Sequence, residues 1–308
     1  MLVGLVLLFF GAEFLVRGSS SLAKRLGLTP LVIGLTVVAY GTSMPETVVS
    51  VKAALVGQGD IAVGNVVGSN IFNIAVILGL AALVCPIRVQ LQLIKVDAPI
   101  MIGVTLVSLL FFANGTFGRV EGLVFFAAMI GYTVMNVILA RRETSKNVQS
   151  EFEDVVPKKL LPLWLELVLV MGGLAILVVG ARFLVDGSVQ IARSIGVSEA
   201  VIGLTIVAAG TSVPELATTI VAALRKEPDI AIGNVIGSNI FNLLGTLGIA
   251  SIISPLTFSG ISAVDLGVMT CYAIVLFPLI CTGFILRRWE GGILLGGYVV
   301  YLFVMWPK

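Results

Sequence analysis

The sequence of 308 residues has no histidine and only three cysteines. Cys85, Cys271 and Cys281 lie in apolar stretches and lack the short spacings that zinc and haem sites use. These absences argue against a zinc site, a haem site and histidine-based catalysis. There is also no nucleophile with an adjacent base and no cofactor motif, so we expect neither an enzyme nor a bound cofactor.

Charged residues are scarce as well, at 12% of the chain, whereas hydrophobic residues make up 58%. A soluble domain of this size could not bury so much apolar surface. The net charge is only +2 and the basic residues do not gather into one face, which argues against a nucleic-acid partner. The composition therefore predicts a protein whose partner is the lipid bilayer, and no obligate protein partner is evident.

Long apolar runs occupy most of the chain, and each is long enough to cross a bilayer core as a helix. They are continuously apolar, unlike the short alternating segments of a membrane β-barrel. We therefore expect an all-α integral membrane fold of about ten helices. The expected spans are 2–23, 30–56, 61–84, 97–113, 120–140, 163–186, 198–223, 230–253, 263–285 and 291–306.

The distribution of lysine and arginine predicts the orientation of these spans, because short cytoplasmic loops collect positive charge. Placing both termini outside puts most of the positively charged loops inside. The polar stretch 141–162 then becomes a cytoplasmic linker between a first five-helix repeat, 1–140, and a second one, 163–308. We expect a multi-pass protein of the cell membrane.

The two halves repeat each other at one offset of 169 residues, the separation of Glu46 and Glu215. The offset relates GLTVVAYGTSMPE to GLTIVAAGTSVPE, and DIAVGNVVGSNIFN to DIAIGNVIGSNIFN. Since five is an odd number, the second copy enters the membrane from the opposite side. Inverted repeats of this kind place transported substrates near the membrane midplane, between interrupted helices.

Glu46 and Glu215 lie well inside two of the expected spans. A charge at that depth costs at least about 2.5–3.5 kcal/mol and normally marks a functional site. A proline precedes each glutamate, and it removes a helical hydrogen bond, so each helix should kink and free backbone carbonyls. Four hydroxyls beside the kinks can then face an ion: Thr42, Ser43, Thr211 and Ser212.

The second repeated motif adds a serine and an asparagine four residues apart, on one face of each helix. They are Ser69, Asn73, Ser238 and Asn242. Together with the glutamates they form a set of oxygen ligands without nitrogen or sulfur, which favours hard cations such as calcium. Two carboxylates balance one divalent ion, two monovalent ions or two protons, and competition between these for one site is the physical basis of antiport.

With these paired motifs the sequence resembles the cation/calcium exchanger superfamily, and within it the sodium/calcium exchanger family of prokaryotic type. The resemblance implies a secondary antiporter in which sodium entry drives calcium extrusion by alternating access, with the first and sixth helices sliding past the others. It also implies ion ligands at Thr42, Ser43, Glu46, Ser69, Asn73, Thr211, Ser212, Glu215 and Ser238, and backbone carbonyl ligands at Ala39 and Ala208.

Asn242 departs from the part of the family that has an aspartate at this position, so we expect a site with two carboxylates. That difference makes co-transport of potassium less favourable and leaves the stoichiometry open. A proton/calcium exchanger with the same two glutamates is the alternative function. A passive cation channel and an intramembrane enzyme that uses the glutamates as an acid and a base are weaker alternatives.

Overall fold

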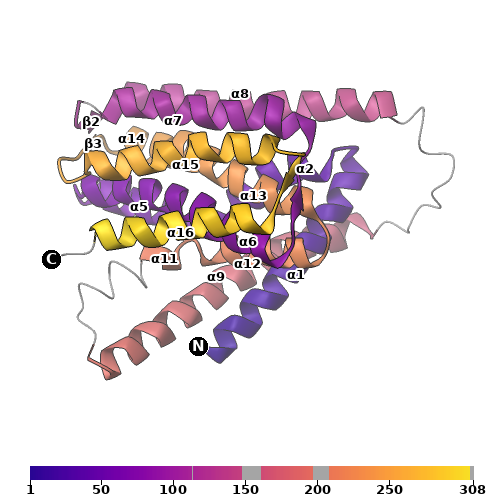
Figure 1. Cartoon of the computed structure of the whole chain (residues 1–308), viewed down its shortest axis with the longest axis horizontal. Helices are drawn as coiled ribbons and strands as arrows, with labels where there is room; N and C mark the ends of the chain where they lie inside the picture. Colours follow the sequence, from indigo (N-terminus) through magenta and orange to yellow (C-terminus); the bar gives the residue numbers. More distant parts are fainter. Residues whose placement is uncertain (113, 148–160, 197–207, 306–308) are drawn as a thin grey trace.

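The structure is a computed structural model that describes the whole chain except residues 113, 148–160, 197–207 and 306–308 (Figure 1). Helices dominate both halves. The first half contains α1 (Leu2–Leu26), α2 (Pro30–Ile33), η1 (Gly34–Val38), α3 (Ala39–Thr42), α4 (Met44–Leu55), α5 (Gly59–Phe72), η2 (Asn73–Leu78), α6 (Gly79–Val84), η3 (Leu93–Asp97), α7 (Ala98–Phe112) and α8 (Arg119–Asn147). The elements named η are π-helical.

The second half contains the matching helices. They are α9 (Leu163–Ser194), α11 (Ala208–Gly210), α12 (Val213–Leu224), α13 (Pro228–Phe241), η5 (Asn242–Thr246), α14 (Leu247–Ile253), α15 (Ala263–Cys281) and α16 (Arg288–Met305). The π-helical segments were not predicted. They interrupt otherwise regular helices, and such interruptions are frequent at functional sites.

Seven helices among the described residues are long and apolar enough to cross a membrane, and one bent pair makes an eighth candidate. The predicted all-helical membrane fold is therefore confirmed. The count of ten spans stays a prediction. Part of the expected span 198–223 lies outside the described residues, and α16, which corresponds to 291–306, is not among the seven.

The kink predicted beside Glu46 is present. Helix α3 ends at Thr42, helix α4 begins at Met44, and the two parts of this span are bent by 45°. Pro45 occupies the first turn of α4, where its missing N–H costs no helical hydrogen bond. The second copy breaks at the same place, between Gly210 and Val213.

Two helices extend further at their C-terminal ends than predicted. Helix α8 continues to Asn147 instead of ending at 140, and α9 continues to Ser194 instead of 186. The extension of α8 runs through charged residues that are good helix formers, so the helix can leave the apolar layer without breaking. Hydropathy marks where the apolar run ends, which is a different boundary from the end of the helix.

Two very short antiparallel β-ladders join the loops of opposite halves. Strand β1 (Ile87–Arg88) pairs with β4 (Ile285–Leu286), and β2 (Thr116–Phe117) pairs with β3 (Leu256–Thr257). The offset of 169 residues converts β1 into β3 and β2 into β4, so each ladder is the counterpart of the other. The sequence analysis missed them because two-residue strands are too short to show a period of two.

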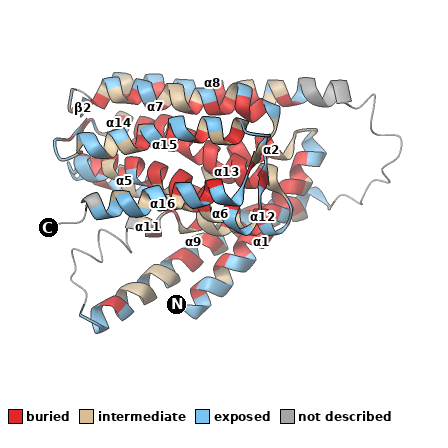
Figure 2. Ribbon diagram, in the orientation of Figure 1, coloured by how far each residue is buried: buried red, intermediate tan, exposed pale blue. Residues whose placement is uncertain are grey.

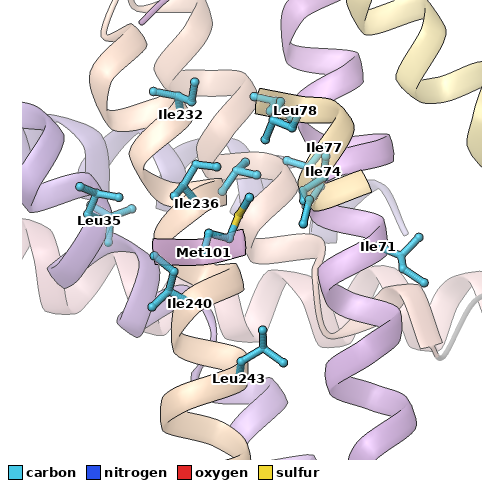
Figure 3. Packing of buried hydrophobic residues seen from close by; sticks show 14 of the residues in the cluster. Leu35, Ile71, Ile74, Ile77, Leu78, Met101, Ile232, Ile236, Ile240 and Leu243 are labelled. Atoms are coloured by element: carbon cyan, nitrogen blue, oxygen red, sulfur yellow. The ribbon is translucent and has the colours of Figure 1, made fainter. Parts of the chain in front are cut away.

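Helices α5 and α13, which carry the second motif, lie at the centre of the bundle (Figure 2). In the span Gly59–Val84, 72% of the most apolar window is buried, and in Pro228–Ile253 the value is 83%, compared with 22% in Arg119–Arg141. Their contact is filled by branched side chains, among them Ile74, Ile236 and Ile240 (Figure 3). The outer helices α1, α8 and α9 instead expose many large apolar side chains, as a lipid-facing surface requires.

Helices α1 and α9 cross each other at one side of the bundle and pack on glycines (Figure 1). A Cβ atom on Gly173 would lie 2.7 Å from the backbone nitrogen of Leu15 and 2.8 Å from the carbonyl oxygen of Gly11. A Cβ atom on Gly11 would lie 2.9 Å from the nitrogen of Leu177. Small residues are what allow membrane helices to approach so closely.

Replacing Gly173 with leucine should therefore separate α1 from α9, because backbone atoms cannot move aside as a flexible side chain can. We expect a loss of about 1–3 kcal/mol or more, measured as a lower thermal unfolding temperature of the purified protein in detergent. Gly172→Leu is the matched control, since a Cβ atom at Gly172 meets nothing within 4 Å. Equal stability of the two variants would contradict the close contact.

Candidate ion-binding site

The two glutamates of the repeated motif meet through hydrogen bonds that cross between the halves. Glu46 lies in the first turn of α4 and Glu215 in the first turn of α12, with exposures of 0% and 1%. The Ser43 hydroxyl donates to Oε1 of Glu215, and the Ser212 hydroxyl donates to Oε1 of Glu46, each at 2.8 Å. The predicted convergence of the two copies is therefore present in the structure.

The second oxygen of each carboxylate has no hydrogen-bond donor in the described part of the chain. Oε2 of Glu46 and Oε2 of Glu215 are buried without a partner, and no ion pair between described residues includes either glutamate. Burying a carboxylate oxygen in this way is costly unless a cation or a proton compensates it. Each glutamate thus keeps one oxygen held by serine and one oxygen available for a ligand.

Two amide oxygens are available in the same way. Asn73 and Asn242 are the first residues of η2 and η5, and their exposures are 1% and 0%. The Oδ1 atom of each side chain is buried and has no hydrogen-bond partner among the residues that the structure describes. A π-helical turn starts at each asparagine and changes the direction of the side chains that follow. Such turns inside α-helices are frequent at functional sites.

The predicted serines of the second motif connect to the kinked helices. Ser212 contacts Ser69 through their hydroxyl oxygens at 3.2 Å, which joins Ser69 to the Glu46 cluster. The Ser238 hydroxyl donates to the carbonyl oxygen of Ala39 at 3.4 Å. Both serines are buried, with exposures of 4% and 0%.

The threonines differ between the copies. The Thr42 hydroxyl lies 3.2 Å from the carbonyl oxygen of Ala39 and 3.1 Å from Oδ1 of Asn234. In contrast, Oγ1 of Thr211 is buried and makes no hydrogen bond of ordinary geometry within the described part of the chain. Ala208 is the first residue of α11, and its side chain lies outside the described part of the structure.

Two further asparagines attach the glutamate helices to the central helices. Nδ2 of Asn65 donates to the carbonyl oxygen of Glu46 at 3.1 Å and to the Ser50 hydroxyl at 2.9 Å. Nδ2 of Asn234 makes the equivalent contact to the carbonyl oxygen of Glu215 at 3.3 Å. The sequence analysis did not select these residues, although their recurrence at the common offset in a polar position of an apolar span was a usable signal.

The contacts across the site come in pairs that the offset exchanges. The bond from Ser43 to Glu215 becomes the bond from Ser212 to Glu46, and both have the same length. The two central amides behave likewise: Asn73 donates to Asn239, and Asn242 donates to Asn70, each at 3.1 Å. Such reciprocity is what a two-fold relation between the halves would produce.

The chemistry of the site follows from its atoms. The available groups are carboxylate, amide, hydroxyl and carbonyl oxygens, and the described residues contain no group of three or more histidine, cysteine, aspartate or glutamate residues that could hold a metal. A site of oxygen atoms with two carboxylates suits a hard cation that is held reversibly, rather than a tightly bound transition metal.

Comparison with known families decides the class of protein. The family described as "Sodium/calcium exchanger protein" matches residues 1–138 and 165–306, which is nearly the whole chain. This chain belongs to the sodium/calcium exchanger family. The resemblance found in the repeated motifs is thereby confirmed, and the family is one of membrane antiporters.

Individual relatives of the family cover the chain from end to end. It is 40% identical to the putative antiporter CaxA of Alkalimonas amylolytica, over 100% of this chain and 98% of the relative. It is 33% identical to the sodium/calcium exchanger MaX1 of Methanosarcina acetivorans, over 99% and 97%. A solved structure of the sodium-calcium exchanger NCX_Mj superposes with a TM-score of 0.84 at 31% identity, covering 99% of this chain and 97% of that one.

Family membership thus accounts for the multi-pass helical architecture. It does not by itself identify the counter-ion. MaX1 and NCX_Mj are described as exchangers of sodium and calcium, whereas CaxA is described only as a putative antiporter.

Proposed function

We propose that this chain is a secondary antiporter that exchanges sodium for calcium by alternating access. The observation that carries the proposal is a set of four buried oxygens without a hydrogen-bond partner. They belong to the repeated motifs of both halves and are Oε2 of Glu46, Oε2 of Glu215, Oδ1 of Asn73 and Oδ1 of Asn242. Calcium takes such oxygens in flexible geometry and in numbers of about six to eight, so hydroxyl and carbonyl oxygens of the site complete the shell.

Charge balance explains why the site exchanges ions. With no basic residue paired to Glu46 or Glu215 among the described residues, the two carboxylates need two positive charges from the transported ions. One calcium ion or two sodium ions supply them, so the two ions compete for the same pair. An empty, doubly charged site is unfavourable in a low-dielectric core, which disfavours movement of the unloaded protein across the membrane.

The additional oxygens favour sodium over protons as the counter-ion. A proton needs only a carboxylate, whereas a sodium ion needs several neutral oxygens. The Ala39 carbonyl, the Thr42 and Thr211 hydroxyls and the two amides of the repeated motifs provide such groups. A proton/calcium exchanger with the same two glutamates remains the alternative, since protonation of both would also neutralise the site.

The reciprocal contacts support two inverted repeats, residues 1–140 and 163–308, joined by a cytoplasmic linker over 141–162. If a two-fold axis in the membrane plane relates the halves, each contact from the first half to the second should recur from the second half to the first, 169 residues apart. The ladders β1–β4 and β2–β3 follow the same rule at the ends of the bundle. The pair α1 and α9, which packs on its own glycines at one side, is suited to move as a unit past the central helices.

Transport by the purified protein in liposomes tests the choice of counter-ion. Liposomes loaded with sodium and diluted into sodium-free buffer containing labelled calcium should accumulate calcium against its gradient at clamped pH. Accumulation with the membrane potential clamped to zero excludes a passive channel, because a channel could otherwise concentrate calcium on a sodium diffusion potential. If uptake ignores sodium and follows an imposed proton gradient instead, the sodium proposal is wrong and the alternative holds.

The two carboxylates can be tested individually. Glu46→Gln and Glu215→Gln should each reduce calcium exchange to the background of empty liposomes, because one remaining carboxylate cannot neutralise a divalent ion. Glu290→Gln is the matched control, since Glu290 is also fully buried but lies at the start of α16 and accepts the backbone N–H of Arg287. Full exchange by either site variant would overturn the proposed ion pair of carboxylates.

The orientation of the chain needs its own experiment. We propose that both termini face the outside, as the positive charge of the inner loops predicts. Green fluorescent protein fused after Lys308 should then stay dark on export, whereas alkaline phosphatase fused there should be active. The reverse result would place the C-terminus in the cytoplasm.

A further inference from the structure

Two asparagines next to the candidate site have no assigned role, although both belong to the repeated motif. Asn70 and Asn239 are buried, with exposures of 2% and 1%. Oδ1 of Asn239 accepts a hydrogen bond from Nδ2 of Asn73, and Oδ1 of Asn70 accepts one from Nδ2 of Asn242, each at 3.1 Å. Each of them therefore contacts the ion-site asparagine of the opposite half.

These bonds determine which end of the ion-site amide is free. A carboxamide carries one oxygen, which can bind a cation, and one NH2 group, which repels it. Because the NH2 groups of Asn73 and Asn242 are engaged, their oxygens are the atoms left without a partner. Rotating either amide by half a turn would break its hydrogen bond and present N–H donors to the ion.

Asn70 and Asn239 are themselves held to different degrees. Nδ2 of Asn70 donates to the backbone carbonyl oxygen of Asn239 at 3.3 Å, which fixes Oδ1 of Asn70 as the acceptor for Asn242. Among the described residues, the only partner of Nδ2 of Asn239 is the thioether sulfur of Met101, at 3.7 Å. Sulfur is a weak acceptor, so the orientation of Asn239 depends more on its bond to Asn73.

We propose that Asn70 and Asn239 are positioning residues that hold the amide oxygens of Asn242 and Asn73 toward the transported ion, each acting across the contact between the halves. The inference rests on the proposed function, because it assumes that these oxygens bind the ion. It goes further in assigning calcium affinity to two residues that do not touch the ion. Partners that orient metal ligands in this way commonly change affinity by about 10–100-fold when removed.

The test is a set of double-mutant cycles on the purified full chain, read as the calcium concentration that gives half of the thermal stabilisation by calcium. Asn239→Leu should raise this concentration by on the order of tenfold. In the background of Asn73→Ala the same change should add little, since the residue that it positions is gone. Asn70→Leu should behave in the same way with Asn242→Ala.

The crossed pairs provide the discriminating result. In these pairs the half-saturating calcium concentration should rise by the product of the two single effects. The pairs are Asn239→Leu with Asn242→Ala, and Asn70→Leu with Asn73→Ala. A role in helix packing alone would lower the unfolding temperature without calcium and leave the half-saturating concentration unchanged. That result, or multiplication in all four pairs, would overturn the inference.

Two control variants separate the inference from loss of folding. Asn239→Ala replaces leucine if the larger side chain prevents folding. Asn136→Leu removes an equally buried asparagine that lies elsewhere, bonded to Gln92, and should not couple to Asn73→Ala.

Measurements on the unmodified protein separate failure of the proposed function from failure of the positioning role alone. If neither calcium nor sodium stabilises it, the proposed function fails and the positioning role fails with it. If calcium stabilises it but the cycles lack the crossed pattern, only the positioning role fails.

Discussion

The structure depends on one constraint, the burial of two carboxylates in the centre of a membrane protein with no ion pair to a basic residue in the described part of the chain. Glu46 and Glu215 each receive one serine hydroxyl from the opposite half and keep one oxygen without a donor. A permanent salt bridge would stabilise the fold but would remove the need for an ion. In the proposed mechanism the transported cations balance this charge instead, which couples the stability of the site to its occupancy.

The remaining architecture makes that arrangement tolerable. Broken helices bring backbone carbonyls and hydroxyls to the carboxylates, and such irregular backbone is stable at this depth only when protein surrounds it. The two central helices provide the surroundings and are the most buried spans of the bundle. Glycine contacts between α1 and α9 leave this outer pair closely joined to each other, while many of its large apolar side chains stay exposed to lipid.

The two copies are similar at the site and different around it. The serine–glutamate and asparagine–asparagine bonds have equal lengths in both copies. Among the described residues, however, the hydroxyl of Thr42 lies 3.1 Å from Oδ1 of Asn234, whereas the hydroxyl of Thr211 has no hydrogen-bond partner. The ion pair between Arg225 and Glu13 also has no counterpart, because the offset places Val56 and Arg182 at the matching positions. A transporter with identical halves would have two equivalent end states, so differences of this kind can make one state the more stable.

Much of this protein was determined by the sequence alone. The apolar runs predicted helices in a membrane, and a single offset that relates both motifs predicted that Glu46 and Glu215 are equivalent. Proline before each glutamate predicted the break that the structure shows at Thr42 and Met44. These features are local or periodic, which is why a linear pattern records them.

Other features required the tertiary structure. The sequence could not show which oxygen of each glutamate is bonded, that Asn70 and Asn239 hold the amides of the opposite half, or that two-residue ladders join the loops. All of these depend on contacts between residues separated by more than a hundred positions. Such contacts are set by how whole helices pack in three dimensions, and no local pattern of residue types contains that information.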